Sequence, residues 1–377
     1  MACGRYRTGA GESTVGDSRS GEAKKMRVVI APDSFGDTLS AVTAAHAIGR
    51  GWLVARPGDE IVAAPQSDGG PGFVDVLANR FGEVRVAEVS GPLGAGVSAR
   101  WLFDDRGGDA VAYLECAQAC GLHQLGGRPT SETAMSASTR GVGRLLDAAL
   151  SAGVTTVVVG LGGSATTDGG RGLVEALGGP QAAVDRLRSV SLVVASDVEN
   201  PLLGEFGAAA VFGPQKGADP ATVELLEQRM TVWSQTLSEM AGRDVSAEPG
   251  SGAAGGLGAA LLALGGRRVS GATVVADATD QQKTVAGADL VITGEGRFDS
   301  QTLRGKVVAA LTGTAAQAGV PTVVLAGQIT LGAAEITEAG IRSAHAVVDV
   351  AGSVEVAMAD AENQLAILAE KVARGTS

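Results

Sequence analysis

The sequence has few cysteines, no long apolar run and no excess of positive charge, and each shortage excludes a class of protein. Its three cysteines among 377 residues are too few for the disulfide framework of a small secreted domain. No uninterrupted apolar run approaches the length of about 18 residues that a membrane-spanning helix needs. The net charge of −11, without a long Lys/Arg cluster, argues against nucleic acid as a partner. We therefore expect a cytoplasmic protein that binds neither membranes nor nucleic acids.

Aromatic residues and histidines are also scarce. With aromatics at 3% and 56 glycines, the core must be built mainly from Val, Leu, Ile and Ala. The three scattered histidines leave few ways to assemble a Ser-His-Asp triad. The GxxxxGK[ST] phosphate loop is absent, and GLGGSA at residues 160–165 matches the dinucleotide fingerprint only weakly. Short Val/Ile/Leu runs that end in Gly, Asp or Ser favour an α/β fold with buried strands.

The order of these runs predicts two domains. Short apolar strands followed by helical patterns occur near both ends of the chain, whereas residues 84–114 alternate in the manner of antiparallel hairpins. We expect one discontinuous α/β domain, formed by residues 26–65 and 287–377, that flanks an inserted α/β domain of residues 66–286. Residues 1–25 have no apolar core and are predicted to be a disordered extension.

The stretch at residues 157–172 is the strongest local signal in the chain. A buried-strand pattern runs into two glycine pairs that bracket Ser164 and Asp168, and a helical pattern follows. Free N–H groups and the dipole of a helix N-terminus make such a loop a common anion site. The alternative is a strained turn in which Asp168 only caps the helix. A second glycine loop, at residues 249–258, predicts close backbone contact with a ligand or with another helix, and residues 274–277 predict a short strand.

Acidic side chains follow several predicted strands, which is where α/β folds bind ligands. Asp33 and Ser34 follow the first strand, Asp68 precedes a glycine pair, and Asp197 follows another apolar run. The alternative for Asp33 is an ordinary Asx turn. We expect a site in the cleft between the domains, where domain interfaces often bind small molecules. The acids expected to meet there are Asp33, Asp68, Asp168, Asp197 and Glu295.

Charged side chains are crowded into the loop at residues 294–306. Glu295, Arg297 and Lys306 lie there, directly after a buried strand, which favours a site over a solvated face. Lys216 lies between turn residues, where its ammonium group would either reach a phosphate or be solvated. Acids, glycine loops and a few cations together suit phosphoryl transfer, which needs positioning, a divalent ion and charge neutralisation.

The ordered motifs of the chain resemble those of bacterial, type 1 glycerate kinase. They are APDSF (31–35), SDGG (67–70), GGSATTDGG (162–170), DVENPL (197–202), VFGPQKGA (211–218), GAAGGLG (252–258) and ITGEGR (292–297), and the match extends to QTLRGK (301–306). The resemblance covers nearly all of the chain from Met26 to the last predicted helix. It implies Mg²⁺-assisted, ATP-dependent phosphorylation of D-glycerate by a two-domain α/β enzyme. We favour 2-phosphoglycerate over 3-phosphoglycerate as the product.

Several positions depart from the family pattern. Gly36 and Asp37 stand where the family has Lys-Gly, Pro71 replaces a glutamate, and Thr167 replaces an asparagine. One cation and one acid near the predicted site are therefore missing. The alternatives are a non-catalytic relative that binds a nucleotide or a phosphorylated metabolite, and a kinase for another small hydroxy acid.

The resemblance and the residue pattern together predict a role for each candidate site residue. Asp68, Asp168, Asp197 and Arg297 are predicted to be catalytic, and Asp168 and Asp197 are also predicted to hold Mg²⁺. The predicted substrate-binding residues are Asp33, Ser34, Lys216, Glu295 and Lys306. The predicted contacts to the nucleotide are Gly162, Gly163, Ser164, Gly255, Gly256 and Gly258. The expected ligands are ATP, Mg²⁺ and D-glycerate, and formation of a homodimer remains open.

Overall fold

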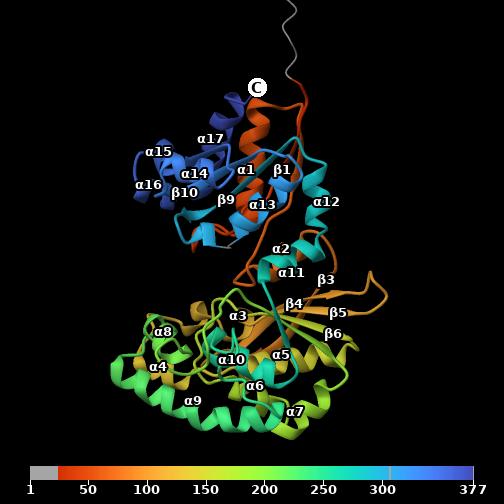
Figure 1. Cartoon of the computed structure of the whole chain (residues 1–377), viewed down its shortest axis with the longest axis vertical. Coiled ribbons are helices and arrows are strands. Elements are labelled where there is room, and N and C mark those ends of the chain that lie inside the picture. Colours follow the sequence, from red (N-terminus) through yellow and green to blue (C-terminus); the bar gives the residue numbers. More distant parts are fainter. Residues whose placement is uncertain (1–23, 305–306, 377) are drawn as a thin grey trace, which may run out of the picture.

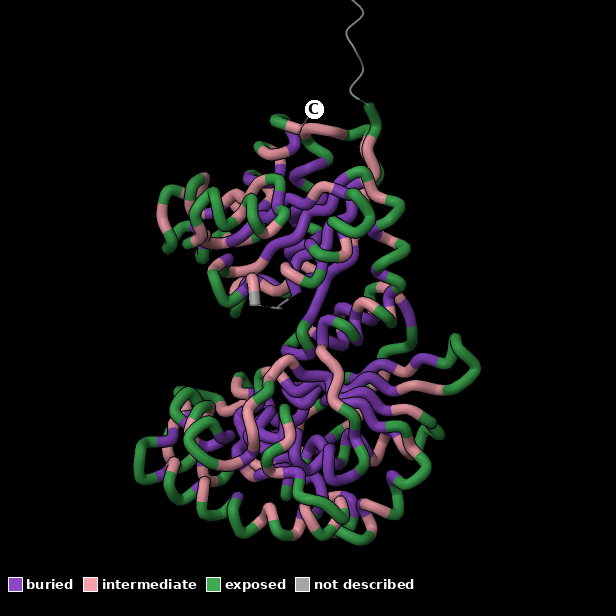
Figure 2. Tube along the Cα trace, viewed as in Figure 1, coloured by how far each residue is buried: buried purple, intermediate pink, exposed green. Residues whose placement is uncertain are grey.

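The computed structural model describes residues 24–304 and 307–376, and the chain within these ranges forms two lobes joined by a waist (Figure 1). Each lobe has its own sheet and its own apolar core, and the buried residues form two groups along the trace (Figure 2). Most of the predicted extension and Lys306, a predicted substrate-binding residue, lie outside the described residues. Among the residues that are described, no helix has the length and apolar content needed to cross a membrane.

The first sheet is parallel and takes its strands from both ends of the chain. Its order is β11-β10-β9-β1-β2. The strands are β1 (Arg27–Ile30), β2 (Glu60–Ala63), β9 (Leu290–Phe298), β10 (Thr322–Ile329) and β11 (Ser343–Ala346). Val29 of β1 pairs with Val62 of β2 and, on the other side, with Val291 of β9. A discontinuous α/β domain is therefore confirmed, and its exact boundaries near residues 65 and 287 stay a prediction.

Helices cover both faces of this sheet. They are α1 (Ala41–Ala55), α12 (Gln281–Ala286), η3 (Thr302–Arg304), α13 (Val307–Gln317), α14 (Ala333–Glu338), α15 (Val348–Ala351), α16 (Val354–Ala359) and α17 (Ala361–Arg374). α1 and α17 pack together on one face, and α12 and α13 pack on the other. A Cβ added at Gly51 of α1 would lie 2.0 Å from the carbonyl oxygen of Ala366 in α17. Only glycine permits this close approach of the two helices.

The second sheet is mixed and comes from the middle of the chain. Its order is β3-β4-β5-β6-β7-β8. The strands are β3 (Glu83–Ser90), β4 (Gly96–Asp104), β5 (Val111–Glu115), β6 (Thr156–Gly160), β7 (Ser191–Ala195) and β8 (Arg267–Val269). β3, β4 and β5 are antiparallel neighbours, as the alternating sequence predicted, whereas β5 to β8 run parallel. The carboxyl ends of β6 and β7 therefore share one edge, which brings the loops after them together.

Helices cover both faces of the second sheet as well. They are α2 (Phe73–Ala78), α3 (Ala117–Cys120), η1 (Leu122–Leu125), α4 (Ser131–Ser136), α5 (Arg140–Ser151), α6 (Arg171–Ala176), α7 (Pro180–Leu187), α8 (Ala208–Phe212), η2 (Pro214–Lys216), α9 (Pro220–Ala241), α10 (Ala253–Ala263) and α11 (Gly271–Ala278). α9 and α10 pack on one face, and α2 and α11 pack on the other, at the waist (Figure 1).

The strand predicted at residues 274–277 is wrong, because these residues belong to α11. Ser270 caps this helix by accepting a hydrogen bond from the N–H of Thr273. Val274 and Val275 then join the core between the helix and the sheet. An apolar pattern of only four residues does not distinguish a buried strand from one face of a helix. The N-cap residue Ser270 was the feature of the sequence that indicated a helix.

Candidate active site

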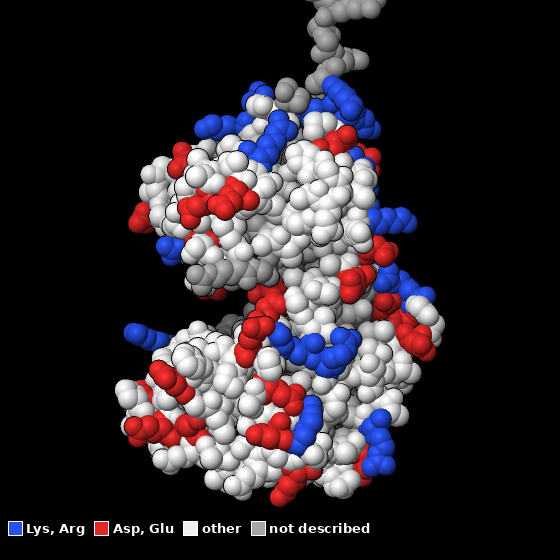
Figure 3. All heavy atoms as spheres, in the orientation of Figure 1, with Lys and Arg blue, Asp and Glu red and all other residues white. Residues whose placement is uncertain are grey.

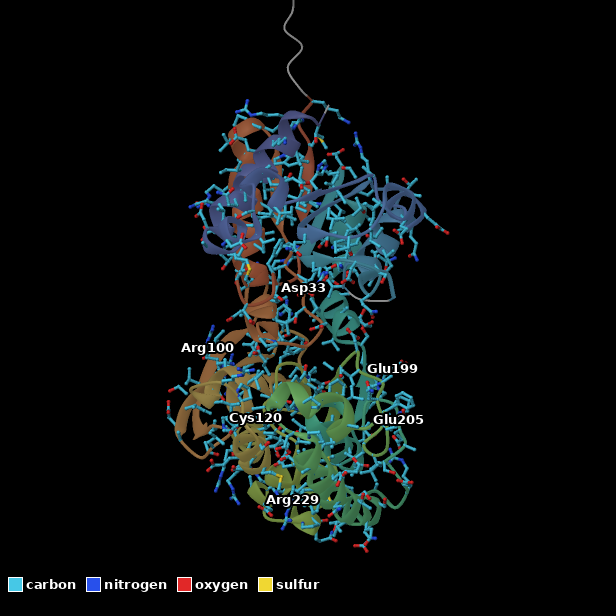
Figure 4. The ribbon with its side chains drawn as sticks, turned by 90° about the vertical axis from the view of Figure 1, so that its left-hand side faces the viewer. Asp33, Arg100, Cys120, Glu199, Glu205 and Arg229 are labelled. Atoms are coloured by element: carbon cyan, nitrogen blue, oxygen red, sulfur yellow. The ribbon has the colours of Figure 1, made fainter. Side chains whose placement is uncertain are left out.

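The first candidate cavity lies at the carboxyl ends of β1 and β9. β1 continues through α1 to β2 on one side, and β9 continues through α13 to β10 on the other. The two following loops therefore diverge and leave a crevice between them. A cavity of about 570 Å³ is present there, and its lining includes Asp33, Ser34, Glu295 and Arg297. The structure thus brings together four of the predicted site residues, and Asp33 lies on the side of its lobe nearest the waist (Figure 4).

Hydrogen bonds hold the polar end of this first cavity in place. The N–H of Asp33 donates to a backbone carbonyl of β9 (2.8 Å), which ties the loop after β1 to the neighbouring strand. Glu295 accepts a hydrogen bond from the hydroxyl of Thr302 (2.6 Å). The side chain of Arg297 is 65% exposed, and its Nε atom lies 3.7 Å from Asp299. Such an exposed pair contributes little to stability, so the guanidinium group can turn to a ligand at little cost.

The second candidate cavity lies at the carboxyl ends of β6 and β7. It has a volume of about 630 Å³. Residues of the second lobe that line it include Asp68, Gly162, Ser196, Asp197, Arg268 and Ser270. Gln301, from the loop after β9, lines the same cavity from the first lobe. This second cavity therefore has walls from both lobes. Figure 3 shows a notch between the lobes with acidic side chains gathered at the waist.

Asp197 has an unusual environment for a carboxylate. Its Oδ2 atom is buried and has no hydrogen-bond partner among the described residues. Burial raises the pKa of Asp197, a hydrogen bond from Ser270 opposes this rise, and the negative charge of Asp68 adds to it. A cation between the two carboxylates would supply the missing partner and relieve their repulsion.

Two carboxylates are enough to hold Mg²⁺, the metal ion that the sequence analysis predicted. Within the described ranges, no group of three or more His, Cys, Asp or Glu side chains is arranged to hold a metal. Mg²⁺, however, is usually bound by one or two carboxylates and completes its shell with water and substrate phosphates. Asp68 and Asp197 therefore fit Mg²⁺ that arrives with a nucleotide.

Asp68 is exposed, but the loop that carries it is largely buried and packs against the central glycine loop. The N–H of Gly162 donates to the carbonyl of Gly69 (3.1 Å). A Cβ at Gly162 would lie 2.3 Å from the Cα of Gly70, so a side chain at this position would push the loops apart. Oδ1 of Asp68 accepts from the N–H of Gly70 (3.0 Å). These contacts keep Asp68 at the same sheet edge as Asp197.

Asp168 lies apart from both cavities and accepts hydrogen bonds from residues at the starts of α5 and α6. Its Oδ2 atom accepts from the N–H (2.8 Å) and hydroxyl (2.9 Å) of Thr139 and from the N–H of Gly172 (3.2 Å), and Oδ1 accepts from the N–H of Gly170 (3.1 Å). Burial raises the pKa of Asp168, and these hydrogen bonds lower it. Asp168 lines a different pocket with Arg229, which lies far from the waist (Figure 4). The capping alternative thus describes Asp168 better than the metal ligand predicted from sequence.

Lys216 and Ser164 are buried inside the second lobe. The Nζ atom of Lys216 donates to the hydroxyl of Ser164 (3.0 Å) and to the carbonyl of Thr166 (2.6 Å). Burial lowers the pKa of Lys216 to about 8. Thr166 also lies beside Cys120, and Cys120 lies in the middle of the lobe (Figure 4). The ammonium group therefore contacts the chain itself and not the cavity where it was predicted to bind substrate.

The second glycine loop makes its close contact with the chain. Gly255, Gly256 and Gly258 are buried, and a Cβ at Gly255 would lie 1.8 Å from the carbonyl oxygen of Thr166. The N–H of Gly169 donates to the carbonyl of Gly255 (3.0 Å). The sequence predicted close contact of this loop either with a ligand or with another part of the chain, and the structure shows contact with the chain. These three glycines are buried and present no accessible backbone to a phosphate. Gly163, by contrast, is exposed and follows Gly162, which lines the second cavity.

Sequence reasoning missed Arg268 and Ser270, which line the second cavity. β8, which carries Arg268, has only three residues, too few for a periodic pattern to mark it as a strand. Ser270 was hidden by the wrong strand at residues 274–277, because its position as an N-cap depends on the helix that follows.

Both the sequence and the fold are similar to those of known proteins. A sequence model of the Glycerate kinase family matches residues 28–185 and 179–377. An uncharacterized protein of Mycobacterium bovis is 57% identical over 348 residues, which are 92% of this chain and 91% of that protein. The glycerate 2-kinase of Escherichia coli is 35% identical over 374 residues, which are 92% of this chain and 97% of that enzyme. A Salmonella typhimurium crystal structure, solved as a candidate glycerate kinase 2, is 35% identical and superimposes with a TM-score of 0.75, covering 93% of this chain and 98% of that one.

Proposed function

The chain belongs to the glycerate kinase family, and we propose that it transfers the γ-phosphoryl group of ATP to D-glycerate. The observation that carries this proposal is the pair Asp68 and Asp197 in a cavity that Gln301 lines from the other lobe. Phosphoryl transfer requires that two anionic reactants be held together among positioned charges. The name of the E. coli relative, a glycerate 2-kinase, supports 2-phosphoglycerate as the product.

Asp197 and Asp68 are the proposed carboxylates for Mg²⁺. Oδ2 of Asp197 is buried without a hydrogen-bond partner among the described residues, whereas both oxygens of Asp168 accept hydrogen bonds from the chain. Asp197 would hold the ion directly, and Asp68 would hold it through water. When bound with the nucleotide, Mg²⁺ supplies neutralisation of the charge on the transferring phosphoryl group.

Asp68 has a second proposed role, and residues near both cavities suit the remaining steps. Asp68 is exposed and would accept a hydrogen bond from the glycerate hydroxyl that receives the phosphoryl group. Arg268 lines the same cavity, and its guanidinium group would bind the glycerate carboxylate. The exposed backbone of Gly163, with φ of 71°, would donate an N–H to a phosphate oxygen. Arg297, at the mouth of the neighbouring cavity, would neutralise the phosphates from the first lobe.

The test is turnover with an identified product. The purified chain is incubated with Mg-ATP and D-glycerate, and phosphorus and carbon NMR distinguish 2-phosphoglycerate from 3-phosphoglycerate. We expect 2-phosphoglycerate and ADP in equal amounts. If no phosphorylated acid forms while the E. coli glycerate 2-kinase turns over in the same assay, the proposed activity is refuted.

A nucleotide-binding protein without kinase activity is the second candidate. Gly36 and Pro71 stand where the family pattern has a lysine and a glutamate. Gly36 lines the first cavity, and the ring of Pro71 lies beside Gly163, so both departures are close to the proposed site. Calorimetric binding of ADP without turnover on D-glycerate, or on a panel of other short hydroxy acids, would favour this candidate.

A further inference from the structure

The cavity at the carboxyl ends of β1 and β9 has an apolar half that binding of glycerate does not explain. Its apolar lining includes Val347, Val348, Val354, Ala357, Met358 and Ala361. Met358 is 60% exposed and Val354 is 40% exposed, so apolar surface is left in contact with water at the wall of a concave site. Apolar walls with a few polar groups at one end are typical of cavities that bind small organic ligands.

The other half of this first cavity is polar and acidic. Its carboxylates are those of Asp33, Asp37, Glu295 and Asp299, and Arg297 is the one cationic side chain among the described lining residues. Carboxylates are good acceptors for hydroxyl groups, and a ribose offers two hydroxyl groups side by side.

We propose that the first cavity binds the adenosine part of the nucleotide, an inference that rests on the proposed kinase function. Adenine would occupy the apolar half beside Met358, and the ribose hydroxyls would donate to carboxylates around Asp33. The volume of about 570 Å³ is in the range of cavities that bind ligands of nucleoside size. D-glycerate is a small polar anion, and it has no apolar surface to match this wall.

The loop after β9 connects the two cavities. Asp299 lines the first cavity and Gln301 lines the second. Residues two apart along a chain lie within about 7 Å of each other, so the cavities adjoin at this loop. The phosphates of a nucleotide whose adenosine fills the first cavity would extend past the loop toward Asp68 and Asp197. Glycerate would then bind in the second cavity, opposite the γ-phosphate.

This arrangement reverses part of the prediction made from sequence. That prediction placed the nucleotide at both glycine loops of the second lobe and the substrate at Asp33 and Ser34. Gly255 and Gly256 are buried against another loop of the same lobe. Asp33 and Ser34 instead line a cavity with an apolar half, which suits the nucleoside.

The binding test uses two substitutions on the same short helix. Met358→Asp places a carboxylate at the proposed adenine position, and we expect calorimetry to show at least about tenfold weaker binding of Mg-ADP, because a desolvated charge would face the base. Val356 is also exposed, at 45%, but is not part of the cavity lining. Val356→Asp is therefore the matched control, and its affinity should stay within about twofold of the wild type. Equal affinity in all three proteins would overturn the inference.

Photolabelling provides a test in the unmodified chain. 8-Azido-ADP is bound in the presence of Mg²⁺, irradiated, and the labelled peptide is identified by mass spectrometry. We expect the label within residues 347–361, with protection by ADP and none by D-glycerate. Labelling at residues 160–172 or 249–258 instead would overturn the inference and return the nucleotide to the glycine loops.

The failure of this inference can be told from the failure of the proposed kinase activity. If the wild type phosphorylates D-glycerate but Met358→Asp binds Mg-ADP normally, the adenosine site is wrong and the activity stands. If no hydroxy acid is phosphorylated but binding of Mg-ADP still depends on Met358, the adenosine site stands and the activity is wrong.

Discussion

The Nζ atom of Lys216 lies 2.6 Å from the carbonyl oxygen of Thr166. The lysine is 3% exposed, and burial lowers its pKa to about 8. Thr166 belongs to the same loop as Gly162, which lines the second cavity, and as the exposed Gly163. We infer that Lys216 holds this loop from inside the lobe and so positions the backbone that is proposed to meet the phosphates.

Lys216 should make the stability of the fold rise with pH in alkaline solution. In the unfolded chain its pKa returns to 10.5, so between pH 8 and 10.5 the unfolded chain binds more protons than the folded chain. The free energy of unfolding should therefore increase across this window, by up to about 3 kcal/mol from this group. Urea denaturation across the window measures it. Lys216→Met should lack the increase, whereas Lys283→Met, at an exposed lysine, should keep it; equal slopes in all three proteins would contradict the assignment.

Asp168→Asn should lower stability rather than act on the chemistry alone. Oδ2 of Asp168 accepts three hydrogen bonds, two from Thr139 and one from Gly172, and an amide NH₂ in its place would face donors. We expect a loss of about 2–4 kcal/mol in the free energy of unfolding, measured by urea denaturation. Asp185→Asn is the control, because that carboxylate is exposed and pairs with the exposed side chains of Gln181 and Arg188. Unchanged stability with abolished turnover would instead restore Asp168 to the catalytic site.

Asp197→Asn should reduce turnover without reducing stability. The substitution removes the negative charge from a buried oxygen that has no partner within the described chain, and it relieves the repulsion from Asp68. We expect kcat to fall by about 100-fold or more and the binding of Mn²⁺, followed by EPR in the presence of ADP, to weaken. Glu205→Gln is the matched control, because Glu205 is exposed and is not among the described residues that line this cavity. Retention of both Mn²⁺ binding and turnover in Asp197→Asn would exclude Asp197 as a metal ligand.

Gly255→Ala should disrupt the contact between the two glycine loops. At φ of 66° the added Cβ would lie 1.8 Å from the carbonyl oxygen of Thr166, so a backbone segment must move. We expect a loss of more than about 3 kcal/mol, seen as a lower urea midpoint or as insoluble protein. Gly265→Ala also has positive φ but meets no atom within 4 Å, and it should cost only about 1 kcal/mol. Equal losses would mean that backbone conformation, and not the loop contact, decides the effect.

Much of the fold could be predicted from sequence, because buried parallel strands read as continuous Val/Ile/Leu runs. The site was harder, because a carboxylate after a strand has the same local pattern whether it binds a ligand or caps a helix. Asp168 and Asp197 look alike in sequence and differ only through donors such as Thr139, which lies 29 residues before Asp168. The burial of Lys216 likewise depends on an acceptor 50 residues away, and no local spacing reveals it.

Glu115, at the end of β5, is a second buried ionisable group close to the proposed site. It is 2% exposed, and its Oε2 atom accepts from the N–H groups of Gly72 (3.1 Å) and Val74 (3.4 Å). Burial raises the pKa of Glu115 to about 7, although these two hydrogen bonds lower it. The loop that carries Asp68 leads into α2. The N–H groups at the start of this helix donate to Glu115, whose pKa is about 7.

Glu115→Gln should therefore stabilise the protein in a pH-dependent way. Between its ordinary pKa of 4.5 and about 7 the folded chain holds a proton on Glu115 that the unfolded chain has released, so stability should fall by up to about 3 kcal/mol as pH rises. Glutamine stays neutral, and its amide oxygen still accepts from both N–H groups. The variant should match the wild type near pH 4.5 and exceed it above pH 7 in urea denaturation, whereas Glu338→Gln, at an exposed position, should show no such difference. A variant less stable than the wild type at every pH would mean that Glu115 is held as a carboxylate by the helix N–H groups.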